Sequence, residues 1–186
     1  MDIRNRWMYR LPMYFLRRLI LFSLALVVTV PTLVADEPVK RDGVVLQLSG
    51  AETIIEAAKK KATEMGLKVN IAVVDPGGHL LHFARMDGAR PASIYTSMSK
   101  AATAALKLGD TGPLPPGAVE PDTHFNLAIE NAAAMSGGKF TSLQGGIAIV
   151  IDGQVVGGIG VGGAKGEEDA KIARAGLAAL LELLQG

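Results

Sequence analysis

The 186-residue sequence contains no cysteine, and this absence excludes several classes of protein. A chain without cysteine has no disulfide scaffold, no thiolate nucleophile, no cysteine-bound zinc and no iron–sulfur cluster. Any metal must therefore be held by other side chains or by the backbone. Aromatic residues are also scarce, at 5%, whereas hydrophobic residues make up 49% and charged residues 20%. This composition is typical of a globular protein, and the length predicts one domain.

The body of the chain, residues 36–186, lacks the basic surplus that nucleic-acid binding requires. The formal net charge is +1, but five of the 19 basic residues and one of the 18 acidic residues lie in residues 1–35. The body therefore holds 14 basic and 17 acidic residues and is mildly acidic. Binding to nucleic acid depends on neutralising many phosphates, so we expect no nucleic-acid partner.

Residues 1–35 have the order of a secretory signal peptide. Five arginines precede an apolar run over residues 19–30, which is followed by Pro31 and a short segment that ends at Ala35. The apolar run is shorter than the roughly 20 residues that span a bilayer. We predict cleavage after Ala35, a periplasmic or secreted protein, and no membrane contact after cleavage; an uncleaved membrane anchor is the alternative.

The pattern of residues 36–186 predicts one domain of strands and helices. We expect strands over residues 44–48, 69–74, 79–86, 147–151 and 154–161, and helices over residues 49–65, 93–108, 125–134 and 167–184. Ser49 and Glu52 have the spacing of a capping box, and Gly66 is expected to end the helix that they begin. Asp152-Gly153 predicts a type I′ hairpin turn. Residues 109–122 contain four prolines and three glycines, which predicts a long surface loop. Because hairpins replace crossovers, we expect an α+β (three-layer α/β) fold with a mostly antiparallel, five-stranded sheet flanked by helices, profilin-like.

Only three histidines are present: His79, His82 and His124. On a regular strand His79 shares a face with Leu81, and His82 shares the opposite face with Ala84. The two strand histidines are thus poorly placed to bind one metal, and a structural zinc site is not expected. A single histidine can ligate a haem iron without a neighbouring ligand. Either strand histidine can equally be a satisfied surface or core residue.

Other polar positions have two interpretations each. Asp75, which precedes Pro-Gly-Gly, is either a catalytic acid or part of an Asx turn, and the turn explains it more simply. Asp87 and Lys100 form either a charge pair at a pocket mouth or a turn residue and a solvated lysine. The glycine run over residues 157–163 lacks the spacing of a dinucleotide-binding turn. We expect these glycines to allow tight turns or close approach of a flat ligand or a neighbouring subunit.

Several short motifs follow one another between residue 73 and residue 176. They are Val73-Val74-Asp75, Gly77-Gly78, Leu80-Leu81, Arg85-x-Asp87-Gly88-Ala89, Lys100-Ala101-x-Thr103-Ala104, Gly145-Gly146-Ile147, Asp152-Gly153-x-Val155-Val156-Gly157, Ile159-Gly160-Val161-x-Gly163 and Asp169 through Ala173-x-Ala175-Gly176. Together they resemble the GlcG/HbpS-type family of haem-binding proteins, which is also similar to the C-terminal domain of PduO-type proteins. The resemblance covers nearly all of the body.

The resemblance implies a compact subunit with a central antiparallel sheet that assembles into homo-oligomers and binds haem. Carried onto this sequence, it makes His79, His82, Lys100 and Thr103 the candidate haem contacts. His82 is the first candidate for the iron ligand, because its strand face is otherwise apolar. The resemblance also implies, for some members, slow haem degradation with iron capture or an accessory role to a sensor kinase.

We therefore expect an exported haem-binding protein that acts in haem sequestration, sensing or slow haem degradation, with a sensor kinase or an uptake system among its candidate partners. Any turnover is expected to be at most slow haem degradation, and no catalytic residue is assigned. Two other classes stay open. One is a binder of small carboxylate metabolites with Arg85, Asp87 and Lys100 around its pocket; the other is an accessory oligomer whose glycine-rich strands form the interface.

Overall fold

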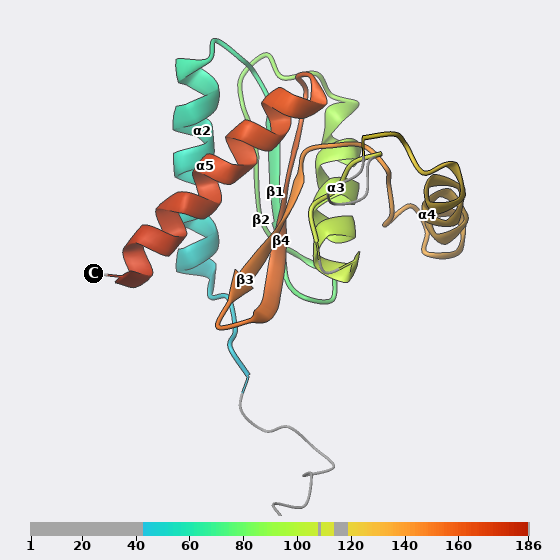
Figure 1. Ribbon diagram of the computed structural model, residues 1–186. Coiled ribbons are helices and arrows are strands. Elements are labelled where there is room, and N and C mark those ends of the chain that lie inside the picture. The colour runs from blue at the N-terminus through green and yellow to red at the C-terminus, as the bar shows by residue number, and fades with distance from the viewer. Residues whose placement is uncertain (1–42, 108, 114–118, 186) are drawn as a thin grey trace, which may run out of the picture. The chain divides into compact units, whose positions relative to one another are not determined.

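The computed structural model describes residues 43–107, 109–113 and 119–185. The expected signal peptide lies outside the described residues, and so does the middle of the expected loop, residues 114–118. The elements (Figure 1) are, in chain order, α2 (Leu48–Glu64), β1 (Asn70–Val74), β2 (Leu80–Arg85), α3 (Ser93–Lys107), α4 (Thr123–Met135), β3 (Gly146–Ile151), β4 (Gln154–Gly162) and α5 (Gly166–Gln185).

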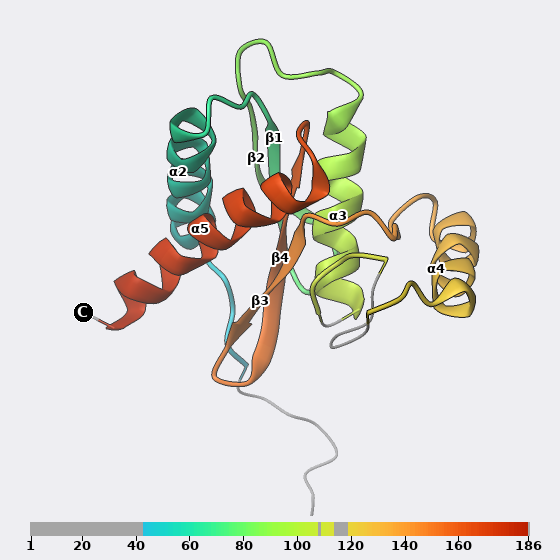
Figure 2. The same ribbon diagram turned by 45° about the horizontal axis from the view of Figure 1, so that its top comes forward.

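Four strands form one wholly antiparallel sheet in the order β2-β1-β4-β3. Helices α2 and α5 pack against each other on one face of this sheet, and α3 covers the other face (Figures 1 and 2). Branched aliphatic residues of the strands and alanines of the helices fill the space between the layers. The predicted three-layer α+β class is confirmed, whereas the likeness to profilin stays a prediction.

The prediction of a fifth strand over residues 44–48 is wrong. Residues 43–47 pair with no strand, and Leu48 already belongs to α2. Val44 and Leu46 instead pack against the hydrophobic core. The segment therefore buries every second side chain without pairing with a strand. The capping box is wrong for the same reason: Ser49 lies inside the helix, and the N-cap Gln47 makes no side-chain capping bond.

Two predicted chain reversals are confirmed by positive backbone φ angles. Gly66 has φ +69° just after α2, where the N–H of Leu67 donates to the carbonyl of Ala62 and closes the helix end. Asp152 and Gly153 have φ values of 50° and 72°, which is the conformation that a type I′ hairpin requires at both positions.

Glycines of β4 allow α3 to approach the sheet closely. A Cβ atom at Gly158 would collide with the carbonyl oxygen of Ala101, and one at Gly160 would collide with that of Ser97. The helix backbone therefore rests directly on the strand. The predicted close approach is confirmed, but its partner is a helix of the same chain and not a flat ligand or another subunit.

The described residues of the proline-rich segment form neither helix nor strand and most are at the surface, as predicted, but Thr111 is an exception. Thr111 is buried, its N–H donates to the carbonyl of Gly146 at 2.9 Å, and its hydroxyl accepts the N–H of Gly146 at 2.8 Å. Asp110 accepts the N–H of Ala148 at 3.4 Å. This segment thus satisfies donors along the outer edge of β3, which would otherwise be free to pair with another chain.

Candidate functional site

A hollow of about 340 Å³ lies between β2, α3 and the segment that follows α4. We call it the α3 hollow; its lining consists of Val74, Gly78, Leu80, Tyr95, Met98, Ser99, Ala102, Gly137, Gly138 and Lys139. The four α3 residues stand at i, i+3, i+4 and i+7, so they share one helix face. Tyr95 is 76% exposed and Leu80 is 47% exposed, which leaves an apolar surface open to solvent.

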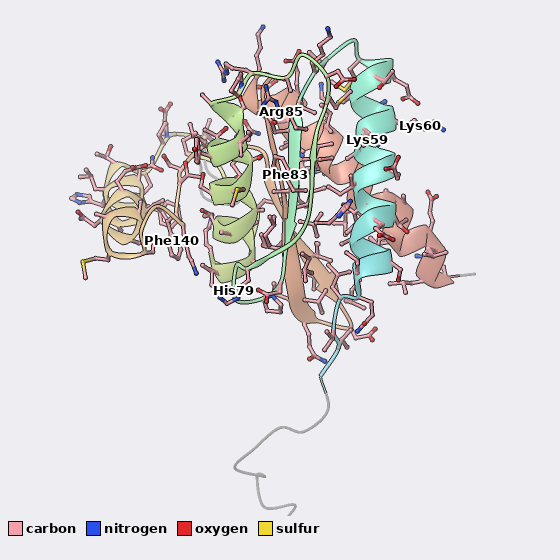
Figure 3. The ribbon with its side chains drawn as sticks, turned by 180° about the vertical axis from the view of Figure 1, so that it is seen from behind. Lys59, Lys60, His79, Phe83, Arg85 and Phe140 are labelled. Atoms are coloured by element: carbon pink, nitrogen blue, oxygen red, sulfur yellow. The ribbon has the colours of Figure 1, made fainter. Side chains whose placement is uncertain are left out.

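His79 lies between two residues that line the α3 hollow, at the start of β2 (Figure 3). Asp75 accepts the backbone N–H of His79 at 2.8 Å and contacts the ring Nδ1 at 3.2 Å. The turn interpretation of Asp75 is therefore confirmed. In the neutral ring, this contact places the proton on Nδ1 and leaves Nε2 with a free lone pair. The imidazole is 72% exposed, so Nε2 is accessible.

The pKa of Asp75 reflects the same contact. Burial acts to raise the pKa, but the backbone N–H and the ring of His79 outweigh it and hold the pKa of this carboxyl below its usual value. Asp75 therefore stays ionised next to the imidazole. A carboxylate that fixes one ring nitrogen is the usual neighbour of a metal-binding histidine.

His82 lies on the opposite face of the sheet from the α3 hollow. Its Cα partner on β1 is Val73, which belongs to the core beneath α2 and α5. The pairing of β1 and β2 shifts between Val73 and Val74, so β2 contains a bulge. Leu81 consequently packs against the α2 side while Phe83 packs against the α3 side, and the strict alternation expected from sequence fails. His82 is half-buried and does not line the α3 hollow.

Lys100 and Thr103 are both buried and bonded within the fold. The Lys100 ammonium donates to Asp169 at 2.7 Å and to the carbonyl of Val161 at 2.9 Å. The expectation that Lys100 pairs with Asp87 or is a solvated lysine is thus wrong, because α3 buries it against β4 and α5. Burial raises the pKa of the Asp169 carboxyl, since the loss of water outweighs the effect of the adjacent ammonium.

Thr103 fastens the segment after α4 to α3. Its hydroxyl donates to the carbonyl of Ser99 at 2.7 Å and accepts the N–H of Thr141 at 2.9 Å. The four candidate contacts are therefore not assembled in one cluster. His79 lies beside the α3 hollow, Thr103 supports its wall from within, and His82 and Lys100 lie elsewhere.

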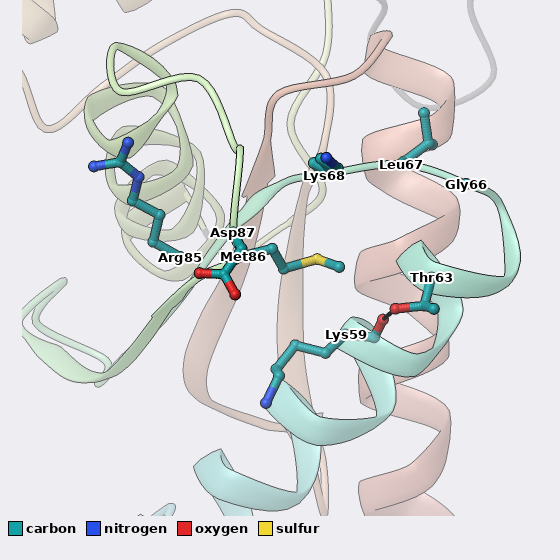
Figure 4. Close-up of a pocket in the computed structure, with 8 residues that line it drawn as sticks. All are labelled: Lys59, Thr63, Gly66, Leu67, Lys68, Arg85, Met86 and Asp87. Atoms are coloured by element: carbon teal, nitrogen blue, oxygen red, sulfur yellow. Dashed lines mark hydrogen bonds between the residues drawn. The ribbon is translucent and has the colours of Figure 1, made fainter.

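A second hollow, of about 560 Å³, lies between the end of α2 and the end of β2 (Figure 4). We call it the α2 hollow; it is lined by Lys59, Thr63, Gly66, Leu67, Lys68, Arg85, Met86 and Asp87. Met86 extends toward α2 at its centre. Arg85 and Asp87 thus share a hollow as expected, but Lys100 is absent from it. Three cationic side chains and one carboxylate give its lining a net positive charge.

Sequence reasoning missed Tyr95, Met98 and Lys139 as lining residues. The signal for the first two was present, because residues 95, 98, 99 and 102 have helical spacing inside a predicted helix. Lys139 carried no such signal. Among the described residues, no three His, Asp or Glu side chains are grouped in a way that holds a metal ion. None of the helices in the described part of the chain is long and apolar enough to cross a membrane.

The fold and the two hollows define the class: a small α+β protein with an antiparallel sheet between helical layers and a histidine beside an apolar hollow. The family model described as "Haem degrading protein HbpS-like" matches residues 46–178. The chain therefore belongs to the HbpS-like family, and the predicted GlcG/HbpS membership is confirmed.

Individual relatives agree with this membership. Protein GlcG of Escherichia coli K12 is 39% identical over 118 residues, which cover 63% of this chain and 81% of GlcG. The crystal structure of HbpS is 30% identical with a TM-score of 0.62, covering 78% of this chain and 97% of HbpS. The crystal structure of a PduOC:haem complex is 27% identical with a TM-score of 0.61, covering 73% of this chain and 95% of that protein.

Proposed function

We propose that this protein binds haem in the α3 hollow, with Nε2 of His79 as the iron ligand. The observation that carries the proposal is the Asp75–His79 pair, which directs a free ring nitrogen to solvent beside an exposed apolar surface. Membership of the HbpS-like family and the likeness to the PduOC:haem complex support haem as the ligand.

The residues around the α3 hollow fit a haem group by their chemistry. Histidine, methionine and tyrosine are side chains that ligate haem iron in proteins. Met98 and Tyr95 line this hollow, and His79 lies between its lining residues Gly78 and Leu80. A volume of about 340 Å³ is at the small end for ligand sites, so one face of the macrocycle would be covered and an edge left in water. Bound haem would supply iron-centred redox and oxygen chemistry, while the chain binds and orients it.

His82 is the alternative ligand, because the sequence pattern favoured it. Its position on the α2 side, half-buried against the core, makes it the weaker candidate: a haem bound there would have to displace packed side chains. The two histidines lie on different faces of the sheet, so single substitutions separate them.

We further propose that the protein is exported and acts in haem sequestration, sensing or slow haem degradation as a homo-oligomer. The arginine-rich segment followed by the apolar run of residues 19–30 supports export. A sensor kinase or an uptake system would then meet the protein outside the cytoplasm.

A haemin titration followed at the Soret band tests the proposal on four proteins: the unmodified chain, His79→Ala, His82→Ala and a control variant. We expect saturable binding with a shifted Soret band in the unmodified protein and in His82→Ala, and a weakened, differently positioned band in His79→Ala. His124→Ala is the matched control, because it removes the third histidine of the chain. Loss of binding in His82→Ala alone would transfer the ligand role to the α2 side of the sheet.

A second candidate function rests on the α2 hollow. Lys59, Lys68 and Arg85 come from three separate segments, and together they favour an anionic ligand such as a small hydroxy acid. A colourless protein that binds glycolate in calorimetry, and loses the binding in Arg85→Met, would support this function in place of haem binding.

A further inference from the structure

We infer that Lys139 binds a carboxylate of the ligand in the α3 hollow, so that this site selects flat apolar molecules with an anionic edge. The inference rests on the proposed function, in which that carboxylate is a haem propionate. It adds a specificity-determining residue that neither the sequence motifs nor the candidate haem contacts include.

The α3 hollow has an apolar wall and one cationic residue. Leu80, Tyr95 and Met98 form the apolar side, whereas Lys139 is the only charged residue in the lining. The side chain is half-buried, and no carboxylate of the described residues lies within 4.0 Å of its ammonium group. A partly buried cation without an internal partner gains more from an incoming anion than a fully solvated one does.

The backbone around Lys139 is fixed by hydrogen bonds on both sides. Its own N–H donates to the hydroxyl of Ser136 at 3.2 Å, and the N–H of Thr141 donates to the hydroxyl of Thr103 at 2.9 Å. Thr103 is 1% exposed and sits in α3, the helix that carries the apolar wall. The backbone that carries Lys139 is therefore coupled to the apolar wall, which lowers the cost of ordering the site on binding.

The approach to Lys139 is open because two glycines precede it. Gly137 and Gly138 have φ values of +69° and +88°, a region that side chains rarely adopt. A Cβ atom at either position would meet nothing within 4 Å, so both border open space. Neither of the two residues before Lys139 therefore has a side chain that could obstruct an anionic group of a bound ligand.

The test compares protoporphyrin IX with its dimethyl ester, which lacks the two carboxylates, by porphyrin fluorescence at constant detergent. Protoporphyrin contains no iron, so its binding does not depend on an iron ligand. We expect the unmodified protein to prefer the free acid by about tenfold, the size of one charge-assisted contact. Lys139→Met should lose this preference, and Lys139→Arg should keep it. Lys60→Met is the matched control and should leave the preference unchanged, because this exposed lysine lines neither hollow. Lys68→Met tests the α2 hollow as the competing site.

The outcomes separate this inference from the proposed function. A preference that survives in Lys139→Met but disappears in Lys68→Met would overturn the inference and move the carboxylates to the α2 hollow. If protoporphyrin binding depends on Lys139 but haemin binding is unchanged in His79→Ala, the inference is upheld and the proposal that His79 ligates the iron is rejected. Equal binding of both porphyrins, or of neither, by the unmodified protein would overturn the inference. Circular dichroism and the urea midpoint check that each variant is folded.

Discussion

Removing the cation of the buried Lys100–Asp169 pair should destabilise the fold in a pH-dependent way. In Lys100→Met the Asp169 carboxylate keeps its burial, at 1% exposure, but loses its contact at 2.7 Å and retains only the N–H of Ala164 at 3.2 Å. An uncompensated buried charge costs about 3–5 kcal/mol. A domain of this size has about 5–15 kcal/mol of total stability, so the substitution removes a large fraction of it.

The sign of the pH dependence follows from the pKa of Asp169. Burial already raises this pKa above the usual 3.8, and loss of Lys100 raises it further. A group whose pKa is raised on folding contributes stability that is present below its unfolded pKa and is lost as the pH rises through the folded pKa. The deficit of Lys100→Met should therefore be small near pH 4 and reach its full size at pH 7.

Urea unfolding at pH values from 4 to 8 measures this deficit, with Lys100→Met/Asp169→Asn as the reference. The double variant has no buried charge and should be more stable than Lys100→Met at pH 7, by most of the 3–5 kcal/mol deficit. Equal stability of the single and double variants at pH 7, or a difference between them that does not change with pH, would refute the reasoning.

Three further predictions concern the packing of α3 and the edge of β3. Gly160→Ala should lower the free energy of unfolding by about 1–3 kcal/mol or more, because its Cβ would collide with the α3 backbone. Gly43 borders open space, so Gly43→Ala should change the free energy of unfolding by less than about 0.5 kcal/mol in the same urea titration. Thr103→Val should cost about 1–3 kcal/mol and speed amide exchange at Thr141, whose N–H loses its acceptor; unchanged exchange would show that the bond is unimportant. Arg174→Ala removes an exposed ion pair at 3.0 Å and should change stability by less than about 1 kcal/mol; a larger loss would mean that this pair holds the segment along β3 in place.

The sequence predicted most elements and the class of the fold because those features depend on local patterns. The β-branched run of residues 69–74, the Asp152-Gly153 turn and the helix stop at Gly66 are each set by neighbouring residues, and each is confirmed. The alternation of residues 44–48 was equally local, but it misled. An apolar residue every second position fits a strand, and it fits equally well an extended segment that packs on the core.

The candidate site was predicted only in part, because its parts come together from distant segments. Sequence alone supplied His79 and its turn with Asp75, since these residues are four positions apart. It also supplied Lys100, but the partner Asp169 lies 69 residues away. Only the packing of α3 on β4, next to the start of α5, shows that this lysine is bonded inside the fold. His82 shares a face with Ala84 as predicted, but a bulge in the pairing of β1 and β2 puts Leu80 on the other face, and side-chain alternation does not encode this bulge.

Family and fold class were therefore determined by the sequence itself, because turn glycines and hydrophobic periodicity are properties of short stretches. The location of the candidate haem site was decided by the tertiary structure. The glycines of β4 let α3 pack closely on the sheet, and this contact brings Tyr95 and Met98 into one hollow with Leu80 and Lys139. Such a surface exists only once the layers have packed, because its lining residues, from Val74 to Lys139, are separated by up to 65 positions in the chain.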